Sequence, residues 1–409
     1  MSQLQVFFEQ LMGIIKPWYI KEINIEGMEV DIKIDFQKGS QFEYKGKMCP
    51  VHDTVERRWR HLNLFQYKAY ITARVPRIET EDGVKTVKVP WAREGSGFTL
   101  LFELFVLQIA TSMSIKETAK LMDETENRIW RIVKHYVNQE INAQDYSEKP
   151  ITNLAMDEVS RRKGHVYITN FVDADTGKVV FVAKGKGSRT VEQFKKDYLK
   201  KGGKVSDIQT IIMDMSPAFI KGAEKAFPKA QIVFDKFHVM KILNELLDDV
   251  RKREQKTFSA FFKKTRYLFL KSKKNLTQRQ KKKLDQILED ESKDTVKAYN
   301  LIQLFKELFE YKKPSAAGRF LIQWIQLCKA SKIPEMVSAA GTIFRHIEGI
   351  LQHIRTKKTN AILEGLNSKL RAITKRAFGF KSFEYLRIMV FMSLRSEEHT
   401  SELQSLSHI

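Results

Sequence analysis

The segment Ile151-Thr152-Asn153-Leu154-Ala155-Met156-Asp157 decides the fold, because it is an apolar strand that ends in a carboxylate. Two more apolar strands follow at residues 164–172 and 178–183. The sequence between them, Asp173-Ala174-Asp175-Thr176-Gly177, is typical of a turn. We therefore expect these three strands to form an antiparallel meander.

The chain then alternates between helices and strands. A helix is predicted at residues 190–201, a strand at 208–213, a helix from Ser216 and a strand at 231–234. Three antiparallel strands followed by two strands separated by helices is the order of an RNase H-like sheet. The expected fold class is an α/β RNase H-like catalytic core.

Three carboxylates in this region predict a metal site. Asp157 and Asp214 each follow an apolar strand, and Glu364 lies in a late helix. Such oxygen ligands suit Mg²⁺ or Mn²⁺, and a pair of these ions can activate water or a 3′-hydroxyl for phosphoryl transfer. We predict that all three residues bind the metal and carry catalysis. Asp235 and His238 are expected beside this edge, with His238 as a polar neighbour because Mg²⁺ prefers oxygen.

Two of these assignments have structural alternatives. Asp214 precedes Ser216 and Pro217, which suit a helix start, so it would also fit as a strand-end turn residue. The helix of Glu364 has a predicted buried stripe at Ile362, Leu366, Leu370 and Ile373. Its other face is polar, as on any solvated helix, and carries Glu364, Asn367, Ser368, Arg371 and Lys375. Of these, Arg371 and Lys375 are candidate DNA contacts.

The first part of the chain is predicted to be rich in strands. Apolar and charged residues alternate over residues 29–36, which indicates a half-buried strand. A second pair of strands is expected at residues 67–75 and 84–89, joined by turn residues 81–83.

Cys49 and His52 have the two-residue gap of a zinc knuckle. A structural site needs four ligands, and no second cysteine pair follows. Structural Zn²⁺ is therefore doubtful, and the flanking strands hold enough apolar residues to form a small core without it.

Residues 98–139 are predicted to be helical. Ser114 and Glu117 form a capping box, and a short turn at residues 122–125 separates two helices. This pattern is typical of a helix-turn-helix, whose second helix would present three polar residues to a DNA major groove: Asn127, Arg128 and Arg131. An ordinary helical hairpin is the alternative.

Residues 244–355 are predicted to be helical throughout and strongly basic at their start. Aromatic residues interleave with the basic ones and are expected to be core contacts: Phe261, Phe262, Tyr267 and Phe269. We expect a folded all-α insertion whose charged faces follow DNA phosphates.

Composition narrows the class of partner. The net charge of +22 and the pI near 9.7 indicate that the partner is a polyanion, and nucleic acid is the first candidate. The apolar runs are too short and interrupted to span a membrane, and no signal peptide is visible. With only two cysteines, far apart, a reducing cytoplasm is expected, in association with the nucleoid.

The last residues depart from this pattern. Residues 395–409 are polar and acidic, and they resemble the translation of a sequencing-library adapter. We therefore treat them as an artefactual tail and expect the natural C-terminus to be missing.

With these residues assembled, the chain resembles bacterial insertion-sequence transposases of the ISL-three family from about residue 49 to 392. The segments that carry the resemblance are Met156-Asp157-Glu158, Asp214-Met215-Ser216-Pro217, Asp235-Lys236-Phe237-His238-Val239, Glu364-Gly365-Leu366-Asn367 and Arg376-Ala377-Phe378-Gly379-Phe380. The resemblance implies that Asp157, Asp214 and Glu364 are a DDE triad. The family has two cysteine pairs in its N-terminal ribbon, whereas this chain has Cys49 with His52 and then Thr80-Glu81-Asp82-Gly83.

The expected function is that of a DNA transposase. It would bind the terminal inverted repeats of its element, cleave there and join the 3′-hydroxyl to target DNA, as a homo-oligomer on DNA. A catalytically silent DNA-binding regulator or remnant is the alternative. The expected organisation is a ribbon-like β-rich domain at residues 1–95, a helix-turn-helix domain at 96–145 and a catalytic domain at 150–394 with its insertion at about 244–355.

Overall fold

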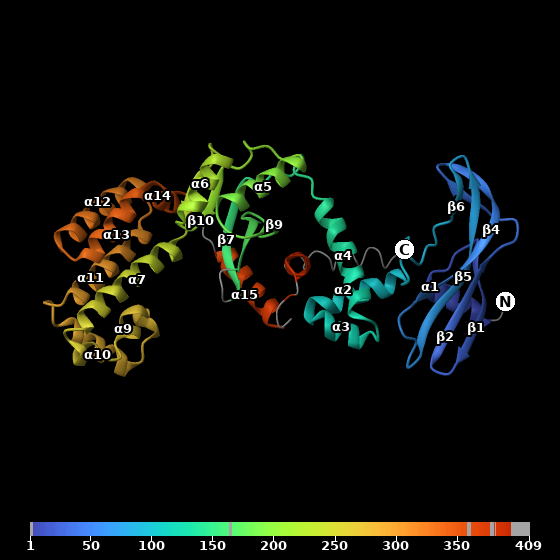
Figure 1. The fold of residues 1–409 in the computed structure, drawn as a ribbon, viewed down its shortest axis with the longest axis horizontal. Helices are drawn as coiled ribbons and strands as arrows, with labels where there is room; N and C mark the ends of the chain where they lie inside the picture. The colour runs from blue at the N-terminus through green and yellow to red at the C-terminus, as the bar shows by residue number, and fades with distance from the viewer. Residues whose placement is uncertain (1–2, 163–165, 358–360, 377–379, 381, 394–409) are drawn as a thin grey trace. The chain divides into compact units, whose positions relative to one another are not determined.

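The computed structural model describes residues 3–162, 166–357, 361–376, 380 and 382–393 (Figure 1). The chain divides into two compact units, Met1–Asn142 with Ile373–Ile409, and Ala143–Ala372. Each unit contains a hydrophobic core of its own. The tail at residues 395–409 lies outside the described residues. Throughout the described part of the chain, no helix is both long and apolar enough to cross a lipid bilayer.

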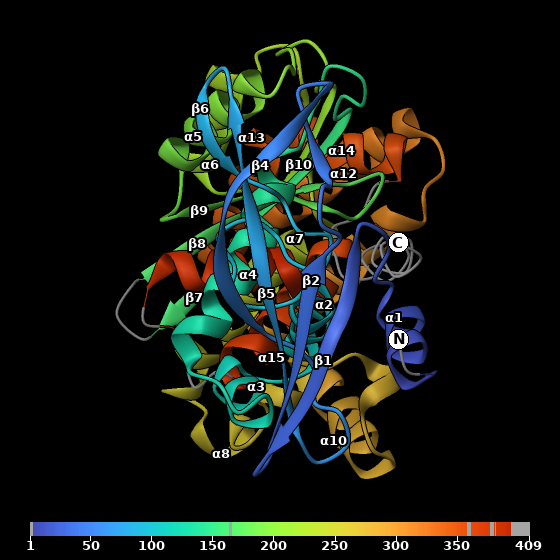
Figure 2. The same ribbon diagram turned by 90° about the vertical axis from the view of Figure 1, so that its right-hand side faces the viewer.

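The first unit begins with helix α1 (Gln3–Met12) and a six-stranded sheet (Figure 2). The strand order is β1-β2-β5-β4-β3, with β6 paired to β5. The strand predicted at residues 29–36 is confirmed as β2, and its Val30, Ile32 and Ile34 are buried. The strands are β1 (Trp18–Glu26), β2 (Glu29–Phe36), β3 (Gln41–Tyr44), β4 (Lys47–Arg60), β5 (Lys68–Thr80) and β6 (Gly83–Thr86).

The predicted pairing across residues 81–83 is also confirmed, because β5 and β6 form an antiparallel hairpin. Gly83 adopts a φ of 88°, a conformation that glycine tolerates best. Strand β6 ends earlier than expected, at Thr86. The N–H of Val87 still donates to the carbonyl of Pro76, but Pro76 has no N–H to return and the ladder stops.

Three helices follow the sheet: α2 (Leu100–Ser112), α3 (Ile115–Leu121) and α4 (Glu126–Asn142). The predicted capping box at Ser114 and Glu117 is confirmed, with both reciprocal hydrogen bonds present. A helix at residues 383–393 also belongs to this unit and packs Tyr385 against Trp130 of α4, with ring centroids 4.3 Å apart.

The second unit is built on a five-stranded sheet in the order β11-β10-β7-β8-β9. The expected meander is confirmed, because β7–β8 and β8–β9 pair antiparallel. Strands β10 and β11 run parallel to β7. The elements are β7 (Asn153–Arg162), β8 (Val166–Asp173), β9 (Val179–Lys184), α5 (Ser188–Lys200), β10 (Thr210–Met213), α6 (Pro217–Ala226) and β11 (Gln231–Phe234).

The prediction that Asp157 ends its strand is wrong. Strand β7 continues to Arg162, and Asp157 lies in its middle opposite Asn170 of β8. The polar residues after Asp157 stay in the sheet because the long antiparallel partner β8 supplies hydrogen bonds along the second half of β7.

The two faces of this sheet are covered differently. Met156, Phe171 and Met213 join a core with Phe194 of α5 and Phe219 of α6. Side chains alternate between the faces along a strand, so Asp157 points to the opposite face. That face meets helix α15 (Ala361–Arg376), which lies across the sheet from α5 and α6 (Figure 1).

The helical region predicted at residues 244–355 is confirmed, but it begins earlier, at Lys236, because Asp235 is the N-cap residue of α7. Phe262 and Phe269 are buried and Phe261 packs on the core, as predicted, whereas Tyr267 is 62% exposed and is not a core residue. The helices are α7 (Lys236–Gln255), α8 (Ser259–Phe262), α9 (Arg266–Leu270), η1 (Lys273–Asn275), α10 (Gln278–Leu288), α11 (Asp294–Lys306), η2 (Glu307–Glu310), α12 (Pro314–Ala330), α13 (Pro334–Arg345) and α14 (Ile347–Thr356).

Candidate active site

A row of polar residues crosses the second sheet. Asp157 pairs with Asn170 of β8. Strands β7 and β10 are parallel, and Ala155 lies opposite Ile212. Asp157 and Asp214 each come two residues later, so they also lie opposite each other. Met213 lies opposite Phe234 of β11, so the next step places Asp235 beside Asp214. The topology therefore gathers Asn170 and Asp157, which lie within strands, with Asp214 and Asp235, which directly follow the ends of the neighbouring strands β10 and β11.

Asp157 is buried, with 9% of its surface exposed. Its Oδ1 accepts a hydrogen bond from the backbone N–H of Glu158 at 2.8 Å, and its Oδ2 accepts one from Nδ2 of Asn367 at 2.6 Å. Burial raises the pKa of the Asp157 carboxyl, although these hydrogen bonds and nearby His238 act against the rise. The negative charge of Asp214 adds to it. An added cation would stabilise this carboxylate.

Asn367 was placed by the sequence on the polar face of its helix, and that placement is incomplete. Leu366, Leu370 and Ile373 are buried as predicted, but Asn367 is buried with them. It lies one position after Leu366 and three before Leu370, so it borders the apolar stripe. The sequence did not single out Asn367 as a candidate site residue, and the signal available was an amide at the edge of a buried stripe, one turn from Glu364.

Asp214 has the turn geometry that the sequence offered as an alternative, and its carboxylate also lies near Asp157. Its Oδ1 accepts a hydrogen bond from the backbone N–H of Ser216 at 3.0 Å, as expected of a turn residue before a helix. Ser216 is the N-cap residue of α6, but its side chain makes no capping hydrogen bond. The carboxylate is half-buried and also lies close enough to Asp157 to raise the pKa of that group.

We expected Asp235 and His238 beside this edge. Asp235 is the last member of the row, and His238 lies near it, close enough to Asp157 to oppose the rise in the pKa of that group. The N–H of Asp235 donates to the carbonyl of Met213 at 3.2 Å, and Asp235 itself is buried at the start of α7. His238 is in the first turn of α7, and its buried Nδ1 has no hydrogen-bond partner in the described structure.

Glu158 is a further carboxylate that the sequence analysis did not select. Burial and the charge of Asp214 raise the pKa of the Glu158 carboxyl, while Lys186 and Lys241 oppose the rise. Carboxylates with perturbed pKa values are common at functional sites.

The side chain of Glu364 falls outside the described residues, as does that of Ile362, although both positions lie within α15. Arg371 and Lys375 are described and exposed on this helix. Among the described residues, no cluster of three or more His, Cys, Asp or Glu side chains is close enough to hold a metal ion.

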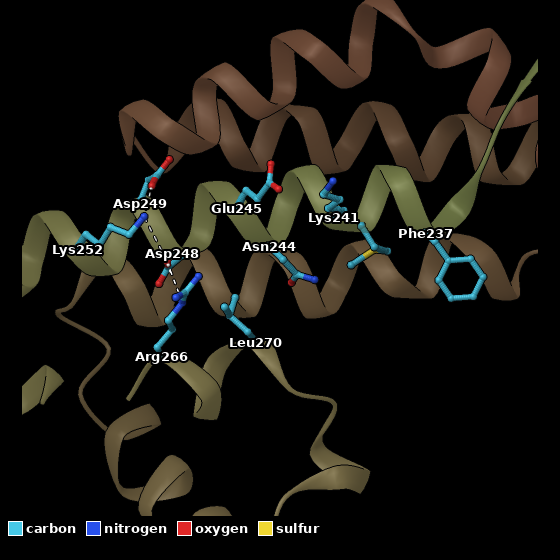
Figure 3. Close-up of a pocket in the computed structure, with 10 residues that line it drawn as sticks. Phe237, Lys241, Asn244, Glu245, Asp248, Asp249, Lys252, Arg266 and Leu270 are labelled. Atoms are coloured by element: carbon cyan, nitrogen blue, oxygen red, sulfur yellow. Dashed lines mark hydrogen bonds and ion pairs between the residues drawn. The ribbon is translucent and has the colours of Figure 1, made fainter. Parts of the chain in front are cut away.

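A groove of about 560 Å³ follows α7 away from this row (Figure 3). Its lining starts at Phe237, next to His238, and continues through Lys241 to Arg266 of α9. Asp248 in its wall forms ion pairs with Arg251, Lys252 and Arg266. Helix α7 thus leads from the carboxylate row towards the segment rich in Lys and Arg at residues 263–283.

The structure does not arrange Cys49 and His52 as a knuckle. Both lie within strand β4, where side-chain exposure alternates from residue to residue. Cys49 packs against the core of the N-terminal sheet, and His52 is on the exposed face beside Asp53, with 3.6 Å between His52 Nδ1 and Asp53 Oδ2.

The three candidate DNA contacts of α4 have different surroundings. Asn127 and Arg131 are exposed. Arg128 donates to Glu124 at 2.6 Å, and its guanidinium carbon lies 4.3 Å from the ring centroid of Phe98. Arg128 therefore has a structural role in addition to any contact with DNA.

Comparison with known proteins identifies the class to which these features belong. Residues 154–390, more than half of the chain, match a family model described as transposase. Residues 87–137 match the helix-turn-helix domain of transposase family ISL3, which also decides against an ordinary helical hairpin.

The chain therefore belongs to the ISL3 family of insertion-sequence transposases. It is 27% identical to the transposase for insertion sequence element IS1001 of Bordetella parapertussis over 360 residues, which cover 85% of this chain and 87% of that protein. It is 26% identical to the transposase for IS1557 of Mycobacterium tuberculosis over 373 residues, 84% of this chain and 83% of the relative. Its function is that of a DNA transposase, a DNA-binding enzyme that cuts and transfers DNA.

Proposed function

We propose that Asp157, Asp214 and Glu364 are the catalytic triad of this transposase and bind Mg²⁺ or Mn²⁺. The observation that carries the proposal is the hydrogen bond between Asn367 and Asp157, which ties the helix of Glu364 to the strand of Asp157. Asp214 follows in register on the neighbouring strand. The donor set suits a hard divalent cation, because it consists of carboxylates with two buried carboxamide oxygens that lack partners in the described structure.

The roles of the residues follow from this arrangement. When bound, the metal ions would activate water or a 3′-hydroxyl and stabilise the leaving oxygen. Asp157 would hold one position of the site from the rigid centre of the sheet, and Asp214 the next from the start of α6. Asn367 would keep Asp157 in a fixed orientation. The protein then contributes position and charge neutralisation to the phosphoryl transfer.

We further infer an RNase H-like catalytic core. The support is the strand order, in which an antiparallel meander is extended by two parallel strands on the side of β7. The proposed domains are residues 1–95, 96–145 and 150–394, with a helical insertion whose observed start is nearer to residue 236 than to 244. The N-terminal domain would fold around its own apolar core without structural Zn²⁺.

The proposed substrates are the terminal inverted repeats of the element and a target duplex, bound by a homo-oligomer. In α4, Asn127 and Arg131 would contact bases. Arg371 and Lys375 of α15 would contact phosphates close to the carboxylates. The exposed basic residues of the helical insertion would contact phosphates farther along the duplex: Lys263, Lys264, Lys271, Lys274, Arg279, Lys282 and Lys283.

The test is an assay of cleavage and joining on labelled DNA that carries the inverted repeats which flank this reading frame. We expect nicks at the element ends and transfer of the new 3′ end to a target duplex, both dependent on Mg²⁺ or Mn²⁺ and abolished by chelation. Cleavage without joining would indicate a nuclease. Binding with neither reaction would indicate a regulator, and either result would overturn the proposal.

A further inference from the structure

Two buried carboxamides flank Asp157. Asn170 is its partner across the antiparallel pair β7–β8, so the two side chains share a face of the sheet. Asn367 approaches the same carboxylate from α15. Asn170 is 1% exposed and Asn367 8%, and Oδ1 of each has no hydrogen-bond partner in the described part of the chain.

Such carbonyl oxygens are costly when they are buried without a partner, and native proteins rarely leave them so. The orientation of the Asn367 amide is fixed by its neighbour. Turning the amide over would place its oxygen against Oδ2 of Asp157, two acceptors at hydrogen-bond distance. Its Oδ1 therefore remains available for another group beside Asp157.

We propose that Asn170 and Asn367 are neutral members of a divalent cation site centred on Asp157. Asn367 is a positioning residue, because its Nδ2 holds the carboxylate in place. Oδ1 of Asn170 and Oδ1 of Asn367 face the cation or a water bound to it. The inference rests on the proposed metal-dependent function and extends it to two residues outside the triad.

The chemistry of the neighbourhood favours neutral ligands. Asp157 lies within β7, Asp214 directly follows β10 and Asp235 directly follows β11, and these three strands are neighbours. Glu158 is close to both Asp157 and Asp214. Further carboxylates would increase their repulsion before a cation binds. Amide oxygens are hard ligands of the kind that Mg²⁺ and Mn²⁺ accept, and they add no charge.

The experiment measures Mn²⁺ binding to the chelator-treated full chain, without DNA, by the loss of the electron paramagnetic resonance signal of free Mn²⁺. The variants Asn170→Leu and Asn367→Leu keep the side-chain size and remove the oxygen. Ser368→Ala, exposed on the same helix, is the matched control, and Asp157→Asn is the reference for loss of the site. We expect each leucine variant to weaken Mn²⁺ binding by about tenfold or more, as for residues that orient metal ligands.

Activity provides a second readout that a merely structural defect would not give. The Mg²⁺ concentration for half-maximal cleavage should rise in both leucine variants, whereas in Ser368→Ala it should match that of the wild type. Circular dichroism in chelator checks folding, and Asn367→Ser replaces Asn367→Leu if the latter unfolds.

Two outcomes separate the claims. If both leucine variants bind Mn²⁺ as the wild type does while Asp157→Asn does not, the carboxamides have no role in the cation site and the inference is wrong, although the proposed triad stands. If Asp157→Asn also binds Mn²⁺ normally, Asp157 is not part of a cation site. Both the proposed triad and the role of the two carboxamides are then wrong.

Discussion

Buried carboxylates in this chain are stabilised in two different ways. Glu103 of α2 accepts hydrogen bonds from Arg93 and Tyr136, so its charge is balanced within the fold. Asp157 accepts hydrogen bonds from the backbone N–H of Glu158 and from the side-chain amide of Asn367. It forms no ion pair among the described residues, and burial raises the pKa of its carboxyl. The first arrangement is structural. The second leaves a buried negative charge available to a cation and indicates a functional site.

A pH dependence is expected from His61, which is buried between the N-terminal sheet and α2. Its Nδ1 lies 2.8 Å from Oγ1 of Thr99, the N-cap residue of α2. Burial, with a smaller effect of Arg60, lowers the pKa of His61 from 6.5 to about 4. Protonation therefore favours the unfolded chain, and the stability present above pH 6.5 is lost as the pH falls towards 4.

The measurement is the free energy of unfolding of the wild type and of His61→Asn between pH 4 and 6.5. The wild type should lose about 3 kcal/mol more than the variant over this range. His52→Asn is the control, because His52 is on the exposed face of β4. Equal losses in wild type and His61→Asn would show that His61 is not buried as a neutral side chain.

At the scale of elements, the sequence predicted those whose pattern is local. Strand β2 has a strict alternation, and the Ser114–Glu117 box lies within one helical turn, so both were found. The predictions failed where contacts with a segment distant in the sequence determine the length of a strand or the burial of a side chain. Strand β7 extends past Asp157 because β8 pairs with it, and Asn367 is buried because α15 packs on the sheet. Neither contact leaves a periodic signal in its own segment.

The candidate site followed the same rule. Asp157 and Asp214 were selected as candidates because each is a carboxylate that follows a run of apolar residues. Asn170 and Asn367 were not selected as candidates, because a single amide in a strand or helix is ordinary until its partner is known.

Helix α4 gives a prediction that separates DNA contacts from structural residues. Asn127→Ala and Arg131→Ala should each weaken binding to the element ends by about 5- to 150-fold, equivalent to about 1–3 kcal/mol, without lowering Tm. Arg128→Ala should weaken binding and also lower Tm, because it removes the interactions with Glu124 and Phe98.

Fluorescence anisotropy with labelled end DNA measures the affinities, and thermal unfolding measures Tm. Gln139→Ala, exposed at the far end of α4, is the control. If Arg131→Ala bound the ends as tightly as this control does, the proposed recognition surface would be wrong.

The N-terminal sheet is predicted to fold without metal. Trp18, Phe36, Phe42, Trp59 and Trp91 pack edge to face or at a tilt in its core. We expect chelator-washed protein to contain well under one Zn²⁺ per chain by elemental analysis, and Cys49→Ser to leave Tm unchanged. Stoichiometric Zn²⁺ that is lost together with folding in Cys49→Ser would contradict this prediction.

At the scale of the whole molecule, the excess positive charge is concentrated. Residues 251–283 contain fourteen Lys or Arg and a single acidic residue, Glu254. Several of these cations are paired internally, including Arg253 with Glu335. The exposed remainder is expected to supply much of the salt-dependent affinity for DNA.

Binding to random duplex should therefore weaken steeply with salt. Replacing Lys271, Lys274 and Lys282 with Gln should reduce the slope of log affinity against log salt by up to about 0.9 for each phosphate that is no longer neutralised. The matched control replaces Lys21, Lys33 and Lys45, which are paired with acidic residues in the N-terminal sheet. Equal slopes in the two triple variants would place the DNA surface elsewhere.

The proposed triad is tested most directly by cleavage of element-end DNA by Asp157→Ala, Asp214→Ala and Glu364→Ala, with DNA affinity measured on the same samples. Each variant is expected to lose Mg²⁺-dependent cleavage, because the metal geometry needs all three ligands. Its affinity for DNA should stay within a few-fold of that of the wild type, because the basic surface is unchanged. Substantial Mg²⁺-dependent cleavage by any of the three would contradict the assignment of that residue to the triad.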